Sequence, residues 1–324
     1  MKLKRSIGII LLLAVTALLA AIIFFCVLPK EVPVISSAFP SMGTLAKVSV
    51  YTSEEDLTLA FTLCKERFEK VEKLCSLYDP ESELSRINAQ AAHAPVVCSP
   101  EMWTLLMRSR QAYRESGGNF DISVKPLMDL WGFYRKKERA PSDEEIVQVM
   151  KKVGFDKLIF NEKERSILFS VPGMALDMGG IAKGYAADMA AADIVAAGVR
   201  SGVVDIGGNL RMLPEPPPGK NFYTVGIRNP SGKGKILPGL LKVAPGMAVS
   251  TSGDYERFVI YQGKRYGHII SPVSGRPTAV SAVTVVASKA LDADIFSTVC
   301  CLGGRNIARK LQDKFPEITI RFAR

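Results

Sequence analysis

Residues 175–188 read Ala-Leu-Asp-Met-Gly-Gly-Ile-Ala-Lys-Gly-Tyr-Ala-Ala-Asp and combine three structural signals in one short stretch. The apolar run 171–176 predicts a strand that leads into an aspartate, and residues 181–197 have a helical composition. Gly179 and Gly180 lie between the two elements, where glycine lets the backbone bend sharply and approach a ligand closely. The sequence therefore predicts a strand, a tight glycine turn and the N-terminus of a helix.

A helix N-terminus of this kind suits an anionic ligand. Its first turn presents unpaired N–H groups and the positive end of the helix dipole, which together favour a phosphate. Lys183, in the first turn of the expected helix, would add a positive charge. A plain strand-to-helix turn with a solvated lysine is the alternative, because the stretch matches neither a GxGxxG fingerprint nor a P-loop.

The composition is that of a globular protein with one large domain or two modest ones. The chain has 324 residues, of which 48% are hydrophobic and 23% are charged. Its formal charge of +10 would suit an anionic partner or a membrane surface. We find no basic stripe interleaved with aromatic residues and no nucleic-acid-binding motif, so we expect no nucleic-acid partner.

The N-terminus resembles a membrane-targeting segment. Residues 7–28 contain no charged residue and are long enough to cross a bilayer as a helix. Lys2, Lys4 and Arg5 precede this run, and positive charge there favours a cytoplasmic N-terminus with the rest of the chain outside. We expect a retained anchor, with cleavage as a signal peptide as the alternative.

Three segments follow from this pattern. We expect residues 1–30 to be the membrane anchor or signal segment and residues 31–40 to be a proline-containing linker. Residues 41–324 would then form the folded domain, which is large enough to bury a sizeable core.

Local signals place further elements in this domain. Thr52 and Glu55 have the spacing of a capping box and predict the start of an amphipathic helix. The polar run 81–88 reads as a surface loop. Residues 202–208, Gly-Val-Val-Asp-Ile-Gly-Gly, repeat the pattern of strand, acid and glycines, and residues 292–302 predict a helix.

The six cysteines match neither a disulfide framework nor a zinc site. The sequence contains no CxxC pair, and the adjacent Cys300 and Cys301 are poor partners for each other. Cys64 and Cys75 would lie roughly 16 Å apart on one predicted helix, too far to bridge. We therefore expect buried free thiols.

His268 is a candidate general base. It lies in a segment of small, polar, turn-forming residues, as does the nearby stretch 251–255. Histidine changes charge near neutral pH and can accept a proton during catalysis. A structural hydrogen-bonding role is the alternative for a lone histidine beside a strand.

Oxygen-bearing side chains lie at the start of the helix expected after residue 291. A spacing of four places Asp294 and Thr298 on one helical face. Such ligands suit Mg²⁺, which usually takes one or two carboxylates and leaves positions for ligand phosphates. Helix capping by Asp292 or Asp294 is the alternative. Together with the glycine turn, these residues suggest a metal-assisted site for a phosphate-bearing ligand.

Eight motifs occur in a recognisable order between residues 41 and 304. They are Ser-Met-Gly-Thr at 41–44, Tyr78 with 82–88, 118–121, 130–133, 177–188, 251–255, 268–270, and Ala293-Asp294 with Ser297-Thr298. As a set they resemble the FAD:protein FMN transferase family, also called the ApbE family. The resemblance implies an α+β, T-fold-like ApbE fold for residues 41–324, with two lobes around a flavin cleft and a transmembrane helix before it.

The resemblance also implies the roles of individual residues. The implied FAD-contacting residues are Met42, Tyr78, Asn119, Phe120, Asp121, Asp177, Lys183 and Ile270. The implied magnesium ligands are Gly180, through its backbone carbonyl, Asp294 and Thr298. Some family members carry another carboxylate where this chain has Ser297.

The activity implied by the resemblance is a Mg²⁺-dependent transfer of FMN from FAD. A threonine hydroxyl of an acceptor protein attacks the FMN phosphorus, AMP leaves, and FMN remains attached through a phosphoester bond. His268, or Asp294 beside the metal, would take the threonine proton, and we favour His268. The alternatives are a FAD pyrophosphatase that gives FMN and AMP, and a non-catalytic extracytoplasmic FAD-binding protein.

The same resemblance implies the setting of the reaction. Expected acceptors are redox subunits of the sodium-pumping NADH:quinone reductase or Rnf type, or other exported proteins with a Ser-Gly-Ala-Thr-like segment. The location expected is the bacterial inner (cytoplasmic) membrane, with a single N-terminal anchor and a periplasmic catalytic domain.

Overall fold

The computed structural model describes residue 16 and residues 34–230, 236, 239–255, 257–278, 280 and 282–323. The transmembrane helix predicted for residues 7–28 therefore lies outside the described residues, apart from Thr16. Within them, no helix is both long enough and apolar enough to cross a membrane.

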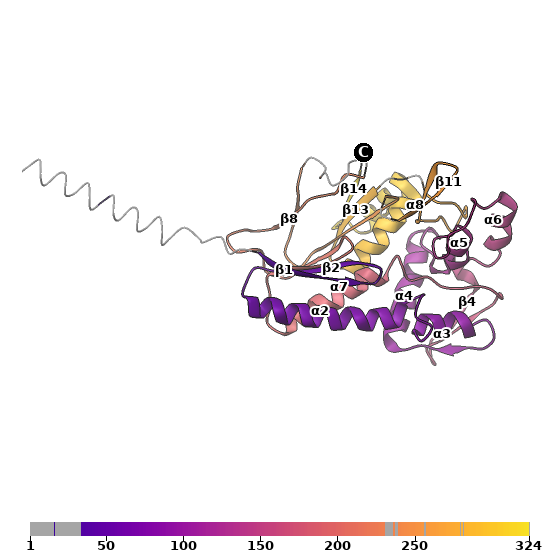
Figure 1. Cartoon of the computed structure of the whole chain (residues 1–324), viewed down its shortest axis with the longest axis horizontal. Helices are drawn as coiled ribbons and strands as arrows, with labels where there is room; N and C mark the ends of the chain where they lie inside the picture. Colours follow the sequence, from indigo (N-terminus) through magenta and orange to yellow (C-terminus); the bar gives the residue numbers. More distant parts are fainter. Residues whose placement is uncertain are drawn as a thin grey trace, which may run out of the picture.

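A seven-stranded antiparallel sheet forms the centre of the molecule (Figure 1). Its strand order is β1-β2-β6-β7-β10-β13-β14, and every neighbouring pair is antiparallel. The strands are β1 (Ile35–Ser41), β2 (Thr44–Val50), β6 (Gly202–Ile206), β7 (Asn209–Met212), β10 (Ala248–Gly253), β13 (Ala282–Ala287) and β14 (Thr319–Phe322). The predicted α+β class is confirmed.

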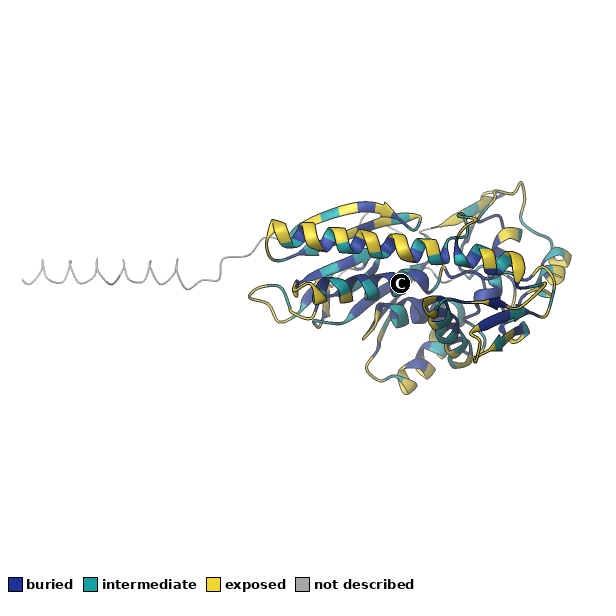
Figure 2. Ribbon diagram, turned by 90° about the horizontal axis from the view of Figure 1, so that it is seen from below, coloured by how far each residue is buried: buried dark blue, intermediate teal, exposed yellow. Residues whose placement is uncertain are grey.

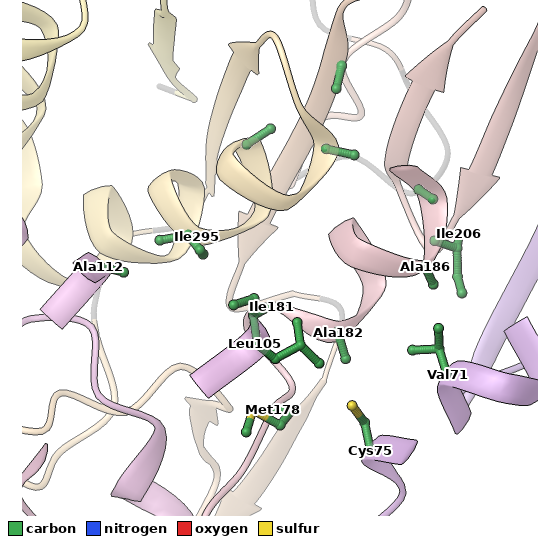
Figure 3. Close-up of a cluster of buried hydrophobic side chains, with 14 of the residues drawn as sticks. Val71, Cys75, Leu105, Ala112, Met178, Ile181, Ala182, Ala186, Ile206 and Ile295 are labelled. Carbon is green, nitrogen blue, oxygen red and sulfur yellow. The ribbon is translucent and has the colours of Figure 1, made fainter. Parts of the chain in front are cut away.

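Three helices contact this sheet: α2 (Glu54–Cys75), α7 (Ala182–Ala196) and α8 (Ala290–Lys314), and α7 also packs against both of the others. The exposed residues of α2 follow its outer surface, as an amphipathic helix requires (Figure 2). A fourth helix, α4 (Pro100–Glu115), adds Leu105 and Ala112 to the same hydrophobic core. Figure 3 shows these two side chains beside Met178, Ile181 and Ile295.

The remaining elements flank this core. They are α3 (Glu83–Gln90), α5 (Lys125–Leu130), α6 (Asp143–Met150), the 3₁₀ turns Ile122–Val124 and Phe155–Lys157, the sheet β3 (Val96–Val97), β5 (Ser166–Phe169) and β4 (Leu158–Asn161), and the pairs β8 (Tyr223–Val225) with β9 (Leu241–Val243) and β11 (Phe258–Tyr261) with β12 (Lys264–Gly267). A second hydrophobic cluster joins α5, α6 and the β11–β12 hairpin around Trp131, Tyr261 and Ile270. A third cluster surrounds Tyr223 and Val249, and the cleft described below lies between the main core and the smaller cluster around Trp131.

Four sequence-based expectations were wrong in detail. The linker prediction is wrong for residues 35–40, because β1 occupies residues 35–41 and Phe39 is buried in the core. Pro40 is tolerated there because β1 is an edge strand, where no outer neighbour needs its missing N–H. The first helix is capped by Ser53 and Asp56, one residue later than predicted.

The polar run 81–88 is not a surface loop but contains most of α3. Ser82 caps this helix by accepting a hydrogen bond from the Ser85 N–H, and Leu84 and Ile87 are fully buried. Two apolar residues three positions apart are enough to bury one face of a short helix, a signal that the surrounding polar residues obscured.

Residues 171–176, predicted to be a strand, form a turn followed by irregular backbone. Instead, the Asn88 side chain hydrogen-bonds to both backbone groups of Leu176: its oxygen accepts from the Leu176 N–H at 2.6 Å, and its amide donates to the carbonyl at 3.0 Å. The next residue, Asp177, donates its N–H to the Ile122 carbonyl at 2.7 Å. A side chain therefore supplies the hydrogen bonds that a neighbouring strand would give, and α3 and the glycine turn are held together.

The five cysteines in the described part of the chain are buried free thiols, as predicted. Burial raises the pKa of Cys64, Cys75, Cys300 and Cys301 to about 12, and that of Cys98 to about 11. These thiols are therefore protonated at neutral pH.

Helices α7 and α8 are in tight contact at Gly184. A Cβ atom placed there would lie 2.4 Å from the Ala290 carbonyl oxygen and 2.8 Å from the Asp294 Cβ, closer than real atoms pack. The Gly184 N–H also donates a hydrogen bond of 3.0 Å to the Asp294 carboxylate. The absence of a side chain at this position lets α8 bring Asp294 up to the first turn of α7.

We predict that Gly184→Ala separates the two helices and lowers the free energy of unfolding by about 1–3 kcal/mol, the usual cost of overpacking. The reason is steric, because alanine otherwise favours a helix interior. Thermal and urea unfolding would measure the loss. Ala192→Ser, on the exposed side of α7, is the control; an unchanged midpoint for Gly184→Ala would contradict the proposed clash.

Candidate active site

A cleft lies between the main core and the smaller cluster. Phe120, Ile122 and Ile269 of the main core form part of its wall, and Met128 and Ile270 of the smaller cluster form another part. Its lining residues are Asn119–Ile122, Val124, Met128, Asp177, Gly179, Gly180, His268–Ile270, Pro272, Thr298 and Leu302. Segments that are distant in sequence thus meet in one cavity.

The structure brings most of the predicted site residues to this cleft. Those that line it are Asn119, Phe120, Asp121, Asp177, Gly180, His268, Ile270 and Thr298. Lys183 and Asp294 lie next to it through contacts described below, and Tyr78 lines an adjoining hollow. Met42 does not line the cleft: it lies in the turn between β1 and β2 and packs against the main core.

Asp177 is anchored at the start of the glycine turn. Its Oδ1 accepts a hydrogen bond of 2.8 Å from the Gly179 N–H, and its Oδ2 accepts a short one from the Tyr134 hydroxyl. The residue is 9% exposed. A buried carboxylate held at both oxygens has a fixed orientation, and this one faces the cleft.

Asp121 lines the cleft, but its carboxylate is bound within the protein. Its Oδ1 accepts from the Ser123 N–H and its Oδ2 from the Phe155 N–H, both at 2.8 Å. Burial raises the pKa of Asp121, while the two N–H groups oppose that shift. These contacts tie the 3₁₀ turn after residue 121 to the segment at residue 155, so a structural role is evident.

Asp294 is the most deeply buried carboxylate beside the cleft, with 2% of its surface exposed. Its Oδ2 accepts from the Gly184 N–H, and its Oδ1 lies 3.7 Å from the Lys183 ammonium. It is therefore not a helix cap; the cap position of α8 is Lys289. Asp292, the other candidate cap, pairs with Arg108 at 2.8 Å.

Asn209 connects Asp294 with Lys183 and was missed at the sequence level. With its amide nitrogen oriented toward Asp294, it donates to Oδ1 at 3.3 Å, and its oxygen accepts from Lys183 Nζ at 3.2 Å. Asn209 is 2% exposed and follows directly after Gly207-Gly208. The repeated pattern of strand, acid and glycines at residues 202–208 was therefore the available signal.

Thr298 faces the glycine turn from α8. A Cβ atom on Gly180 would lie 3.6 Å from Thr298 Oγ1 and 3.2 Å from a ring carbon of Phe120, so the turn packs tightly here. The Thr298 hydroxyl donates to the Asp294 carbonyl at 3.1 Å and lies 3.2 Å from the Ser252 hydroxyl. Ser297 is 2.7 Å from Ser252, within the same group of buried hydroxyls.

Gly180, Asp294 and Thr298 offer the kinds of oxygen atom that coordinate a hard cation. A buried carboxylate, a hydroxyl and a backbone carbonyl are the hard ligands that Mg²⁺ prefers. Among the residues that the structure describes, no group of three or more His, Cys, Asp or Glu could hold a metal ion. A cation at Gly180, Asp294 and Thr298 would thus need further oxygens from a ligand or from water, as Mg²⁺ bound to a phosphate usually has.

His268 has a defined tautomer. Its Nδ1 lies 3.1 Å from the Arg257 carbonyl oxygen, which can only accept, so Nδ1 carries the proton and Nε2 is an acceptor. Burial, then the nearby Lys183 cation, lower the pKa of His268 to about 4, although the bond to Arg257 opposes the shift. The imidazole is therefore neutral at neutral pH and can accept a proton at Nε2.

Tyr78 and Tyr134 form an aromatic wall next to the cleft. Tyr78 is 68% exposed, and its ring meets that of Tyr134 edge to face with centroids 5.8 Å apart. An exposed aromatic ring at a cleft provides a surface on which a planar ligand could stack. Tyr134 follows the predicted motif at 130–133 directly, and only its position after that motif could have indicated it.

The model of the ApbE family matches residues 42–322, most of the chain. The chain belongs to the ApbE family. A FAD:protein FMN transferase of Treponema pallidum is 31% identical over 306 residues, which cover 87% of this chain and 82% of that protein. One from Klebsiella pneumoniae is 31% identical over 261 residues, covering 80% of this chain and 79% of its own.

Solved structures show the same fold. The ApbE protein of Thermotoga maritima superposes with a TM-score of 0.81 at 29% identity, over 89% of this chain and 93% of its own. The flavin transferase ApbE of Vibrio cholerae gives a TM-score of 0.77 at 27% identity, over 89% and 92% of the two chains.

We predict that Asp121→Ala mainly destabilises the fold, by about 2–4 kcal/mol, because two buried N–H groups lose their acceptor. Asp121→Asn keeps one carbonyl oxygen as an acceptor, so its free energy of unfolding should fall by about half as much. Urea unfolding would give both values. Asp143→Ala, which removes an exposed ion pair with Arg276, is the control and should cost under about 1 kcal/mol. A stable but inactive Asp121→Ala would refute the structural role.

Proposed function

We propose that this chain is a FAD:protein FMN transferase, which moves FMN from FAD to a threonine of an acceptor protein and releases AMP. The observation that carries the proposal is the meeting of the start of α7, the oxygen side chains of α8 and His268 at one cleft. Membership of the ApbE family and the names of the relatives support the same activity.

FAD would span the cleft and the adjoining hollow. The rings of Phe120 and Tyr78 and the side chain of Ile270 would contact its apolar surfaces. Its diphosphate would lie at the start of α7, where the positive end of the helix dipole and Lys183 favour negative charge. Asp177 would orient a donor group of the ligand, because both of its oxygens are already fixed.

Gly180, Asp294 and Thr298 would hold Mg²⁺, which would neutralise charge on the diphosphate when bound. The role of the protein there is to place its own groups. Asn209 and the Gly184 N–H fix the Asp294 carboxylate, and Lys183 adds a positive charge 3.7 Å from it. The two lobes would exclude water from the reacting atoms, which strengthens these electrostatic interactions.

The transfer itself forms one P–O bond and breaks another. The acceptor threonine oxygen bonds to the FMN phosphorus, the bond to the AMP phosphate oxygen breaks, and AMP leaves with that oxygen. His268 would accept the threonine proton at Nε2, the nitrogen that the Arg257 carbonyl leaves unprotonated. If water replaced threonine, the same site would release FMN and AMP as a FAD pyrophosphatase.

The acceptor and the location belong to the same proposal. The expected acceptors are exported or membrane redox subunits, of the sodium-pumping NADH:quinone reductase or Rnf type, with a Ser-Gly-Ala-Thr-like segment. An N-terminal anchor over residues 7–28 would hold the domain on the periplasmic side of the inner membrane. Support for the anchor comes from the length, apolarity and flanking charge of that segment.

The full-length chain, incubated with FAD, Mg²⁺ and an acceptor carrying that segment, should release AMP and flavinylate the acceptor threonine. AMP would be measured by chromatography and covalent FMN by mass spectrometry of the acceptor. An acceptor with threonine replaced by valine is the control and should stay unlabelled. AMP with only free FMN would establish the pyrophosphatase instead, and bound FAD without AMP would mean a carrier.

The acid limit of the reaction should lie near pH 4 rather than near 6.5. His268 must be neutral to accept the proton; because its pKa is lowered to about 4, activity should persist as pH falls until that value is reached. The measurement is kcat/KM against pH. His268→Gln should lose most activity at every pH, whereas His93→Gln, which alters an exposed histidine, should change neither rate nor profile. An acid limit near 6.5 would contradict the lowered pKa of His268, and full activity in His268→Gln would exclude His268 as the base.

A further inference from the structure

Arg257 contacts Tyr78, Phe133 and Tyr134 and so joins three segments. Its guanidinium Nη2 donates to the Phe133 carbonyl at 2.5 Å and to the Tyr78 hydroxyl at 3.1 Å. Its guanidinium carbon also lies 5.2 Å from the centre of the Tyr134 ring, a cation–π distance. One side chain thus fixes the two aromatic rings beside the cleft.

Tyr134 connects Arg257 with Asp177. Its ring receives a second cation, Lys125, 5.3 Å from the centroid, and its hydroxyl donates to Asp177 Oδ2. Burial, and then the neighbouring carboxylate, raise the pKa of Tyr134 above its ordinary value, so the phenol stays protonated and remains a donor. Asp177 is therefore oriented by a chain of contacts that begins at the exposed Arg257.

The backbone of Arg257 has a separate task. Its carbonyl oxygen accepts both the N–H of His268, at 3.0 Å, and Nδ1 of the same residue, at 3.1 Å. These bonds set the position and the tautomer of the imidazole. They do not depend on the Arg257 side chain, because every residue carries a carbonyl.

We propose that Tyr134 and the Arg257 side chain are positioning residues for the flavin donor, acting through Asp177 and Tyr78. The inference rests on the proposed function, since FAD is the ligand that these two residues would orient. The side chain of Arg257 serves ligand binding, and its carbonyl serves the proton acceptor. The two tasks of this one residue can be separated by substitution.

The test is FAD affinity of the full-length chain, measured by the change in flavin fluorescence without an acceptor. Tyr134→Phe removes one hydroxyl and should raise the Kd for FAD about tenfold, the range for a hydrogen bond to a charged group. Arg257→Ala should have an effect of similar size, and Arg257→Lys a smaller one. The double variant Tyr134→Phe/Arg257→Ala should bind FAD only slightly more weakly than Arg257→Ala does, because both substitutions break the same chain of contacts.

Matched controls come from the same lobe. Tyr261→Phe removes a hydroxyl that donates to the Trp131 carbonyl at 2.7 Å, and Arg265→Ala removes a guanidinium 3.3 Å from Asp254. These bonds do not involve Tyr78, Tyr134 or Asp177. Both control variants should therefore keep the Kd for FAD within about twofold of the wild-type value. Near-ultraviolet circular dichroism and thermal unfolding would show that each variant is folded.

Steady-state kinetics of the transfer would distinguish a positioning role of Arg257 from a general loss of structure. Arg257→Ala should raise KM for FAD while leaving kcat at saturation within about threefold. The carbonyl that holds His268 remains in this variant, but a positive charge that lowers the pKa of His268 is lost, so the pH at which activity falls should move slightly upward.

Unchanged FAD affinity in both Tyr134→Phe and Arg257→Ala, or equal losses in the controls, would overturn the inference. A wild-type chain that binds FAD but transfers no FMN would refute the proposed function alone, because the affinities of the variants would still decide the positioning roles. A wild-type chain that binds no FAD would refute both.

Discussion

The contact between Gly184 and the first turn of α8 determines the geometry of the whole site. The Gly184 N–H holds the Asp294 carboxylate at 3.0 Å, and the missing side chain at that position lets the two helices come together. Helix α7 follows the glycine turn, and α8 carries Thr298, so this contact sets how the glycine turn and Thr298 lie relative to each other at the cleft. The sheet beneath them mainly supplies a platform to which both helices are fixed.

The sequence alone predicted much of the fold, because regular elements leave strong periodic signals. The amphipathic helix α2, the helix α7 after the glycine turn and the helix α8 expected from residue 292 all follow from local pattern. The errors occurred where tertiary contacts replaced local ones. Residues 171–176 look like a strand by composition, yet the hydrogen bonds of Leu176 come from the Asn88 side chain, which no local pattern can reveal.

The candidate site was predictable in its residue types but not in its connections. Motif order indicated His268, Asp294 and the glycine turn, and the structure brings them together. The groups that orient them left only weak signals: Asn209 follows the repeated glycine pair at 207–208, and Tyr134 follows the motif at 130–133. Such groups act through contacts between residues far apart in the chain, so only a three-dimensional structure shows them.

The buried cysteines can serve as natural probes of local unfolding in this protein. A thiol reacts as the thiolate, and burial both suppresses that form and blocks access in the folded state. Cys64 and Cys75 lie on α2, and Cys300 and Cys301 on α8, so both major helices carry a probe. The rate at which a thiol reagent labels each pair would therefore report how often each helix leaves the core, without any engineered label.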